Sequence, residues 1–443
     1  MPESTAANSE TLFERAQSSL PGGVSRNTLL HGEHPLYVSH SAGCRVVDVD
    51  GVERIDFANN MASLIHGHAY GPIVDAVSEQ LRRGTAFTMA TEAEIRMAET
   101  LRGRTTSFEK IRFVNSGTEA VMTGIKAARA FTGRTRVAKI EGCYHGSYDY
   151  AEMSQAPAPA NWGNADHPNT VPLAQGTPPS VVEETIILPF NDPENAIAIL
   201  NENADQIACV LMDPIPHRVG MLAASSESVQ ALRTWTHENG ALLMFDEVIS
   251  FRNEFGGMQA RFDFDPDLTS LGKIIGGGFP IGALAGRSDV MDVFVKGEHG
   301  MRLPHSGTFS GNPISITAGN VALDEFDKAA VERLNTLGDY ARAQVATAIH
   351  NADVPACVTG SGSLLRVHLK PEPPRNYRES YLSAPESAAL NALIEALYDN
   401  GIMMIHTCTT ALSTAMTPVE IDRLADAMEQ SLIAVREQLL SCA

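Results

Sequence analysis

The sequence predicts an α/β fold: a large domain built on a mainly parallel sheet, followed by a smaller α+β domain. From about residue 70 onward, segments of helical and strand character alternate, which is the pattern of a parallel sheet with crossover helices. The strand candidates are short and almost wholly apolar, as expected for strands covered on both faces. At 443 residues the chain is long enough for two or three domains. The candidate buried strands are Ile111–Val114, Val137–Ile140, Thr185–Leu188, Ile207–Met212 and Ala241–Phe245.

The first 70 residues predict a helix followed by a small sheet. Residues 10–20 have the spacing of a short amphipathic helix, which Pro21-Gly22-Gly23 ends. Strand-like alternation follows, and Asp50-Gly51 is a strong hairpin turn between the last two strands. We expect this N-terminal segment, residues 1–70, to pack with the small domain. The expected strands are 36–38, 44–49 and 54–57.

The rest of the chain is expected to divide into a large domain at 71–315 and a small domain at 316–443. The small domain has the predicted order helix, strands, helix. Two proline-rich stretches, Gln155–Ser180 and Lys370–Arg378, are expected to be loops. The first carries six prolines, and a loop of that length inside a domain is usually functional or mobile.

Composition and charge restrict the class of function. A hydrophobic content of 44% fits a soluble globular enzyme, and a net charge of −20 argues against binding to nucleic acid or to anionic membrane surfaces. No apolar run approaches the roughly 20 residues of a membrane span, and the polar N-terminus lacks the features of a signal peptide. We therefore expect a cytoplasmic protein. The six cysteines form no CxxC pair, so neither a metal site nor a disulfide framework is expected; they are residues 44, 143, 209, 357, 408 and 442.

Lys273 and Asp246 form the pair of residues with the clearest chemistry. Lys273 lies in an apolar, glycine-rich stretch, where the pKa of its amine is expected to fall so that it can form a Schiff base. Asp246 ends an apolar strand upstream, where an acid can pair with the ring nitrogen of pyridoxal 5′-phosphate. The alternative is a lysine that extends its amine to the surface and an aspartate that caps a helix. The two residues, taken together with the phosphate motif described next, favour the cofactor.

Ser116, Gly117 and Thr118 are expected to bind a phosphate group. They lie between a predicted strand and a predicted helix at 118–131, which Gly133 ends. The free N–H groups and the dipole of a helix N-terminus favour an anion, Gly117 permits a close approach, and the two hydroxyls add donors. The alternative is ordinary N-capping by serine or threonine.

Three further loops carry candidate ligand contacts. Tyr144 can stack on a flat ring and His145 can line the same pocket, the alternative being a turn with a half-buried aromatic side chain. His217 and Arg218 follow another strand, at the edge where ligands gather in α/β sheets, and can touch substrate. The alternative for these two is a solvated basic loop. Thr308, in a later glycine-rich loop, is a second candidate phosphate contact.

Five short motifs occur along the chain in this order: NSGTEA (115–120), GCYHG (142–146), FDEV (245–248), PDLTSLGKIIGGG (266–278) and HSGTFSGNP (305–313). In this order they closely resemble the class III aminotransferases, which are pyridoxal phosphate enzymes of fold type I. Within that family the sequence is similar to the glutamate-1-semialdehyde aminomutases and to the β-amino-acid transaminases. The resemblance runs from about Leu20 to the C-terminus.

The resemblance implies a role for each motif. Lys273 would form the Schiff base and carry the proton, Asp246 would keep the ring nitrogen protonated, and the loop at 116–118 would hold the phosphate. Tyr144 would stack on the ring and Val248 would pack on its other face. By the same resemblance, Thr308 would reach the cofactor of a neighbouring subunit, which implies a homodimer with active sites at the subunit interface.

Departures from the family pattern bear on the reaction. The aminomutases carry a glutamate before the final strand, whereas Ile405–Ser413 contains no acid, and the aromatic residue usual near Met61 is missing. Arg26 resembles the arginine that faces a substrate carboxylate in the β-amino-acid transaminases. Their second, C-terminal arginine is missing here, and His406 or Thr409 stands in its place. The pocket is therefore expected to prefer an amine, or to hold a carboxylate differently.

Together these features predict a transaminase that moves an amino group from an amine or (β-)amino acid to an oxo acid or ketone. The alternative among enzymes is an intramolecular aminomutase acting on glutamate-1-semialdehyde. Two further classes are a non-catalytic binding or regulatory module with the same fold, and a nucleotide binder that does not use pyridoxal phosphate. The intact Lys273 and Asp246 argue against the non-catalytic module.

Overall fold

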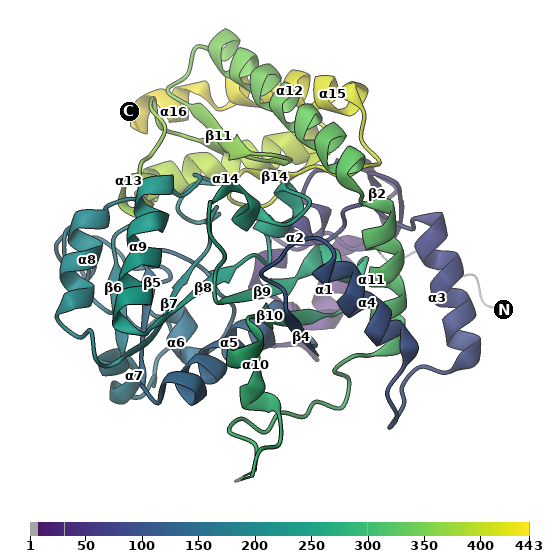
Figure 1. The fold of residues 1–443 in the computed structure, drawn as a ribbon. Coiled ribbons are helices and arrows are strands. Elements are labelled where there is room, and N and C mark those ends of the chain that lie inside the picture. The colour runs from purple at the N-terminus through teal and green to yellow at the C-terminus, as the bar shows by residue number, and fades with distance from the viewer. Residues whose placement is uncertain (1–7, 31, 299, 443) are drawn as a thin grey trace.

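The computed structural model describes residues 8–30, 32–298 and 300–442. Its centre is a seven-stranded sheet of order β4-β10-β9-β8-β7-β5-β6, with helices on both sides and a second lobe above it (Figure 1). Neighbouring strands from β9 to β6 are parallel, while β10 runs antiparallel to both of its neighbours. The predicted α/β class is confirmed. The five predicted strands are β4 (Lys110–Val114), β5 (Arg136–Ile140), β6 (Thr185–Leu188), β7 (Ile207–Met212) and β8 (Leu242–Asp246).

Two strands of the central sheet, β9 (Leu268–Gly272) and β10 (Gly282–Gly286), were not predicted from the sequence. Both are completely buried, but they contain mainly small residues and few of the β-branched or aromatic residues that favour strands. Close packing explains the small residues, because a Cβ atom added to Gly282 would collide with the carbonyl oxygen of Ser116. Tertiary packing therefore decides the conformation of this segment.

The helix predicted at 118–131 is α5 (Gly117–Thr132), and Gly133 ends it in the left-handed conformation, with φ of 72°. It packs on β7, β9 and β10, which places its N-terminus at the edge of the sheet. Other helices that cover this lobe are α3 (Gly71–Arg83), α4 (Glu92–Arg102), α6 (Asp149–Glu152), α7 (Pro179–Glu184), α8 (Pro193–Asn201), α9 (Ser226–Asn239), α10 (Ser288–Met291) and α11 (Pro313–Glu325).

The upper lobe contains an antiparallel sheet of order β11 (Cys357–Ser361), β12 (Leu364–His368) and β14 (Thr409–Ala411). Helix α12 (Lys328–Ala352) packs along α15 (Pro418–Ala434) across this lobe (Figure 1). The predicted order of helix, strands, helix was incomplete, because α14 (Ala384–Asp399) lies between β12 and the short strand β13 (Ile402–Met403). The remaining short helices of this part are α13 (Tyr377–Ser380) and α16 (Arg436–Cys442).

The N-terminal segment begins with α1 (Ser9–Gln17), close to the predicted helix, and continues into the predicted hairpin. Strands β1 (Val38–Ala42), β2 (Arg45–Asp48) and β3 (Glu53–Asp56) form a sheet whose fourth member, β13 (Ile402–Met403), comes from the C-terminal part of the chain. Strand β13 pairs with β3 in parallel, so that Ile402 lies opposite Ile55. One hydrophobic core includes residues from the N-terminal, middle and C-terminal parts. The limits of the three predicted domains stay a prediction.

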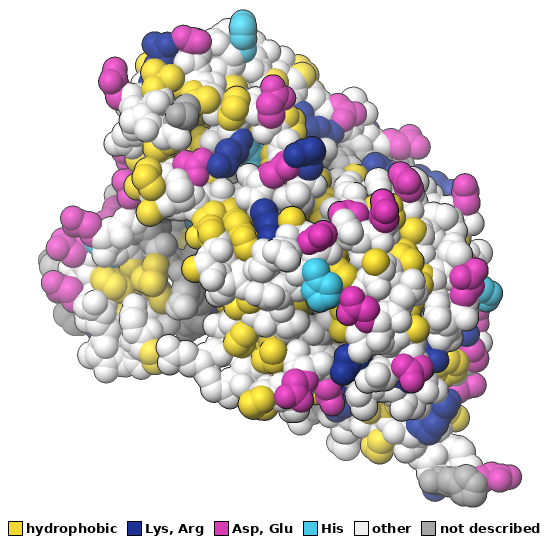
Figure 2. Space-filling view, turned by 90° about the vertical axis from the view of Figure 1, so that its left-hand side faces the viewer, with side chains coloured by type: hydrophobic (Ala, Val, Ile, Leu, Met, Phe, Trp, Pro, Cys, Tyr) yellow, Lys and Arg dark blue, Asp and Glu magenta, His cyan; other side chains and the backbone are white. Residues whose placement is uncertain are grey.

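The surface carries charges of both signs. Figure 2 shows acidic side chains spread over one face of the molecule, with lysine and arginine side chains interspersed and not gathered into a patch. Within the described residues, no helix combines the length and the apolar character needed to cross a membrane.

Candidate functional site

A cavity of about 580 Å³ opens where the carboxyl ends of β7, β8 and β9 meet. This is the edge at which parallel α/β sheets bind ligands, and the volume suits a small organic molecule. Every predicted site residue except Thr308 lines it: Arg26, Ser116, Gly117, Thr118, Tyr144, His145, His217, Arg218, Asp246, Val248, Lys273 and His406. Thr308 is exposed on the loop before α11, and its contact with a neighbouring subunit stays a prediction.

Lys273 follows β9 directly and begins a short 3₁₀ turn, Lys273–Gly276. Its backbone has φ of 50°, which is unusual for a side chain of this size. The amine Nζ donates a hydrogen bond to the carbonyl oxygen of Met61, at 2.7 Å. Burial lowers the pKa of this amine to about 8, since the charged form loses its hydration. About a tenth of the amine is therefore neutral at pH 7, and able to act as nucleophile or base, which is far more than for an ordinary lysine.

Asp246 ends β8, and three groups hold its carboxylate. Its Oδ2 lies 2.8 Å from Nδ1 of His145, while Oδ1 accepts hydrogen bonds from the Ser270 hydroxyl and from the Val248 backbone N–H, both at 3.1 Å. Burial lowers the pKa of His145, although Asp246 opposes that shift. The imidazole Nε2 is buried and has no polar partner in the described part of the chain. The carboxylate is thus fixed in place at the cavity wall.

The N-terminus of α5 faces the same cavity. Ser116 caps the helix, with its hydroxyl accepting a hydrogen bond from the Glu119 N–H at 3.1 Å. A Cβ atom added to Gly117 would lie 2.9 Å from the methyl groups of Val248, so only glycine fits between the helix and this side chain. The amides of the first helical turn have no partner within the helix. Together with Lys273, these donors fit a phosphate-bearing aldehyde cofactor.

A left-handed turn forms part of the cavity wall. Four successive residues, Asn59–Ala62, have φ of 43°, 46°, 57° and 67°, although none of them is glycine. Each such residue costs about 1–2 kcal/mol, so other contacts must hold the turn. The Asp56 carboxylate accepts the N–H groups of Ala58, just before the turn, and of Asn59, both at 2.8 Å. The buried Arg252 donates to the carbonyls of Ala62 and Leu412. The turn presents the Met61 carbonyl to Lys273, a contact that the sequence pattern does not reveal.

Asp213 is a cavity residue to which the sequence analysis assigned no role. Strands β7 and β8 pair in parallel with Met212 opposite Phe245, so Asp213 and Asp246 follow side by side. Burial, and then the charge of Asp246, raise the pKa of Asp213 well above its ordinary value. Its place at the end of a predicted strand was a signal that could have identified it.

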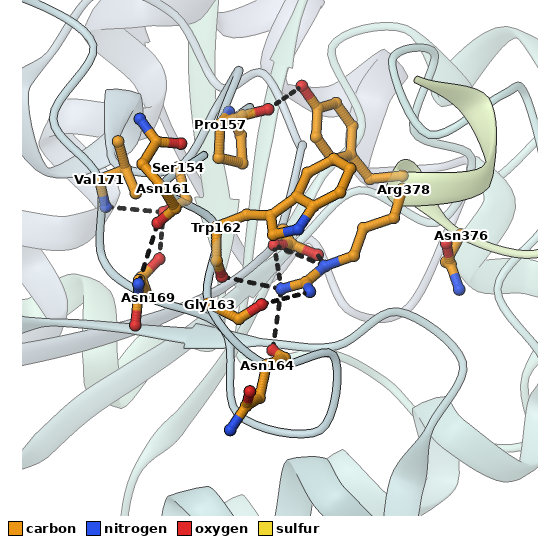
Figure 3. Close-up of polar contacts among 12 residues, drawn as sticks. Ser154, Pro157, Asn161, Trp162, Gly163, Asn164, Asn169, Val171, Asn376 and Arg378 are labelled. Atoms are coloured by element: carbon orange, nitrogen blue, oxygen red, sulfur yellow. Dashed lines mark hydrogen bonds and ion pairs between the residues drawn. The ribbon is translucent and has the colours of Figure 1, made fainter. Parts of the chain in front are cut away.

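The proline-rich loop predicted at 155–180 is fastened to the upper lobe through Arg378. The Arg378 guanidinium pairs with Glu141 at 2.9 Å and donates to the carbonyl oxygens of Trp162, Gly163 and Asn164 (Figure 3). It also lies 5.0 Å from the centre of the Trp162 ring. Glu141 stands three residues before Tyr144, so this cluster helps to fix the loop that lines the cavity.

Candidate substrate contacts lie around the cavity on several elements. Tyr144 packs edge-on against His217, with 5.9 Å between the ring centres. Arg218 is half-buried, whereas His406 and Arg26 are exposed. The Arg26 guanidinium donates to the side-chain oxygen of Asn60, at 3.1 Å. The cavity therefore combines the Lys273 amine and the Asp246 carboxylate with two arginine side chains.

Comparison with known proteins agrees with this chemistry. The family "Aminotransferase class-III" matches residues 29–433. The glutamate-1-semialdehyde 2,1-aminomutase of Methanothermobacter thermautotrophicus is 39% identical over 373 residues, which cover 84% of this chain and 86% of that protein. Among solved structures, an omega-transaminase from Sphaerobacter thermophilus is 45% identical, with a TM-score of 0.94 and coverage of 98% and 99% of the two chains. A β-phenylalanine aminotransferase from Variovorax paradoxus is 31% identical, with a TM-score of 0.85 and coverage of 96% and 93%. The chain therefore belongs to the class-III aminotransferases, enzymes that transfer amino groups with pyridoxal 5′-phosphate.

Proposed function

We propose that this enzyme is a transaminase that exchanges an amino group between two separate substrates: an amine or amino acid donor and an oxo-acid or ketone acceptor. The observation that carries the proposal is the convergence of the Lys273 amine, the Asp246 carboxylate and the N-terminus of α5 on one cavity. The solved relatives that cover nearly the whole chain at 45% and 31% identity are named as transaminases, which supports the same reaction.

The proposal gives each cofactor-binding group a position. When bound, pyridoxal phosphate condenses with amines and takes up the electrons left behind when a substrate C–H bond loses its proton. Its phosphate would lie against the amides and hydroxyls at the start of α5. Asp246 would hold a proton on the ring nitrogen, and its bond to His145 would orient the carboxylate for that contact. Tyr144 and Val248 would contact the two faces of the ring.

Lys273 is proposed to move the proton. A neutral amine at Nζ can accept the proton from the substrate carbon and return it at a second position, and the low pKa makes the neutral form available. The Met61 carbonyl oxygen, 2.7 Å from Nζ, would accept a hydrogen bond from the protonated amine and stabilise it between the two proton transfers.

An internal aminomutase is the second candidate, because curated relatives at 39% identity carry that name. The residues at the cavity wall favour the transaminase. The aminomutases carry a glutamate in the stretch that corresponds to Ile405–Ser413. In this chain none of the residues that this stretch contributes to the cavity is an acid: Ile405, His406, Thr407, Thr409 and Ala411.

One experiment separates the two candidates. The purified enzyme, loaded with pyridoxal phosphate, is mixed with 3-aminobutyrate, β-phenylalanine, 1-phenylethylamine or alanine, with no acceptor present. A transaminase loses the long-wavelength absorbance of its lysine-bound cofactor in one turnover and releases one equivalent of carbonyl product. An aminomutase converts glutamate-1-semialdehyde completely with no acceptor. Turnover of the semialdehyde without any amine half-reaction would overturn the transaminase proposal.

We also propose that the enzyme is a homodimer. Several large apolar side chains are exposed near the loop that bears Thr308: Phe309 is 58% exposed, Phe87 48% and Met89 84%. Asn312, at the start of α11, bonds to the carbonyl of Thr85 and so joins these segments. Light scattering should give twice the mass of the chain, and Met89→Glu should lower it. In the dimer Thr308 would reach the partner's phosphate site.

Finally, we propose that the enzyme works in the cytoplasm. All six cysteines are free thiols, and four of them are buried. This agrees with a reducing compartment. A fluorescent fusion in the source cell would test the location.

A further inference from the structure

Arg218 is a cation without a counterion. It lines the cavity and is half-buried, yet within the described part of the chain its guanidinium makes no hydrogen bond or ion pair. Two other sequestered arginines have partners: Arg378 pairs with Glu141, and Arg252 donates to a hydroxyl and two carbonyls. An arginine has five N–H donors, and those of Arg218 are free to take a ligand.

The groups around Arg218 are cationic or neutral. Burial lowers the pKa values of both His217 and His406, and the positive charge of Arg218 is the next largest cause for each of them. Arg366, on β12, is only 6% exposed and donates to the His217 carbonyl at 2.8 Å, and its Nε has no partner among the described residues. Positive charge is therefore concentrated on this wall.

The two carboxylates of the cavity do not balance this charge. Asp246 is paired with His145. Burial and the charge of Asp246 raise the pKa of Asp213, which favours its neutral form. Like charges that are partly removed from water repel each other, so an anion that enters here would be held strongly. The two histidines, kept neutral, add N–H donors without adding repulsion.

We propose that Arg218, with His406 beside it, binds the carboxylate of a 2-oxo-acid acceptor and of the amino acid formed from it. This proposal rests on the transaminase function proposed above. Arg218, His406 and Lys273 line the same cavity, so a carboxylate held by Arg218 enters the space that the Lys273 side chain borders. That geometry fits a carboxylate attached directly to the carbonyl carbon, and Arg218 thereby replaces the C-terminal arginine that this chain lacks.

Arg26 lies on a different segment and is not equivalent. It is exposed, and its guanidinium already donates to Asn60. Substitution of Arg218 should therefore weaken the binding of a 2-oxo acid, whereas substitution of Arg26 should not.

The test compares two acceptors in the half-reaction of the enzyme that carries the aminated cofactor: pyruvate, and propanal, which has no carboxylate. For Arg218→Met, the ratio of kcat/KM for pyruvate to kcat/KM for propanal should fall about 10- to 100-fold, as expected for the loss of a charge-assisted contact. Arg218→Lys should recover part of the ratio. Arg375→Met, an exposed arginine outside the cavity, should keep the wild-type ratio.

A binding measurement gives a second readout that needs no turnover. Oxamate, an unreactive analogue of pyruvate, should bind the wild-type holoenzyme in calorimetry, and Arg218→Met should weaken that binding by a similar factor. An unchanged ratio and unchanged oxamate affinity in Arg218→Met, with both lost in Arg26→Met, would overturn the assignment. If neither acceptor reacts with the wild type, the transaminase proposal fails, while oxamate binding still decides whether Arg218 forms the carboxylate site.

Discussion

His145 and Asp246 form a buried pair in which imidazole Nδ1 lies 2.8 Å from carboxylate Oδ2, at the wall of the cavity that forms the candidate site. Both side chains are almost fully enclosed. The pairing sets the direction of the carboxylate, while Ser270 holds its other oxygen. A charged group oriented in advance in a dry site stabilises charge that develops during reaction.

The first prediction concerns this pair. Asp246→Asn removes the charge and keeps the shape, so kcat should fall about 100- to 1000-fold with the cofactor still attached. His145→Ala leaves the carboxylate charged but less well oriented, and the loss should be nearer to tenfold. Single-turnover absorbance measures both. Equal losses in the two variants would show that the charge is not the decisive property.

The second prediction uses the titration of Lys273. Burial brings the pKa of its amine to about 8, and only the neutral amine attacks an aldehyde. After the cofactor has been removed, the rate of reattachment of pyridoxal phosphate should therefore rise with pH up to about 8 and then level off. Stopped-flow absorbance measures this rate, and Lys273→Ala should give no signal. A rate that keeps rising to pH 10 would indicate an ordinary lysine.

The third prediction concerns the contact between Gly117 and Val248. Gly117→Ala places a Cβ atom 2.9 Å from the Val248 methyl groups, so the start of α5 must move. Overpacking of this kind costs about 1–3 kcal/mol, and the affinity for pyridoxal phosphate should fall about tenfold or more. Val248→Ala in the same chain should restore part of the affinity. Gly71→Ala, where a Cβ meets no atom within 4 Å, is the matched control.

The fourth prediction concerns the Arg378–Glu141 pair, whose side chains are 14% and 6% exposed. Arg378→Ala leaves a buried carboxylate unpaired and should destabilise the fold by about 3–5 kcal/mol in denaturant unfolding. Arg378→Lys should rescue little, because lysine has no planar fork. Arg375→Ala, which breaks an exposed pair in the same segment, should leave the unfolding midpoint unchanged. Equal shifts of the unfolding midpoint in the two alanine variants would show that the Arg378–Glu141 pair does not stabilise the fold more than an exposed pair does.

The sequence predicted those parts of the site that follow from local pattern. Lys273, Asp246 and the start of α5 lie where strand and helix patterns end, and the carboxyl edge of a parallel sheet brings such ends together. Asp213 also follows a predicted strand directly, so the same rule could have assigned it to the site.

Other parts depend on contacts between distant segments, which leave no local pattern. The left-handed turn Asn59–Ala62 contains no glycine and is held by Arg252 across the molecule. Strands β9 and β10 are selected by close packing, although their residues do not favour strands. The lack of a partner for the Arg218 guanidinium depends on the positions of the side chains around it, which the sequence does not give.

The pairing of β3 with β13 bears on the order in which the chain can fold during synthesis. Ile55 and Ile402 are partners in that ladder although 347 positions separate them. A ribosome that adds about 5–20 residues per second needs about 17–70 seconds to make the intervening chain. Throughout that interval the growing polypeptide exposes an unpaired β3 edge, which is a template for wrong pairing. Chaperone protection during translation should therefore matter more for this enzyme than its final stability would suggest.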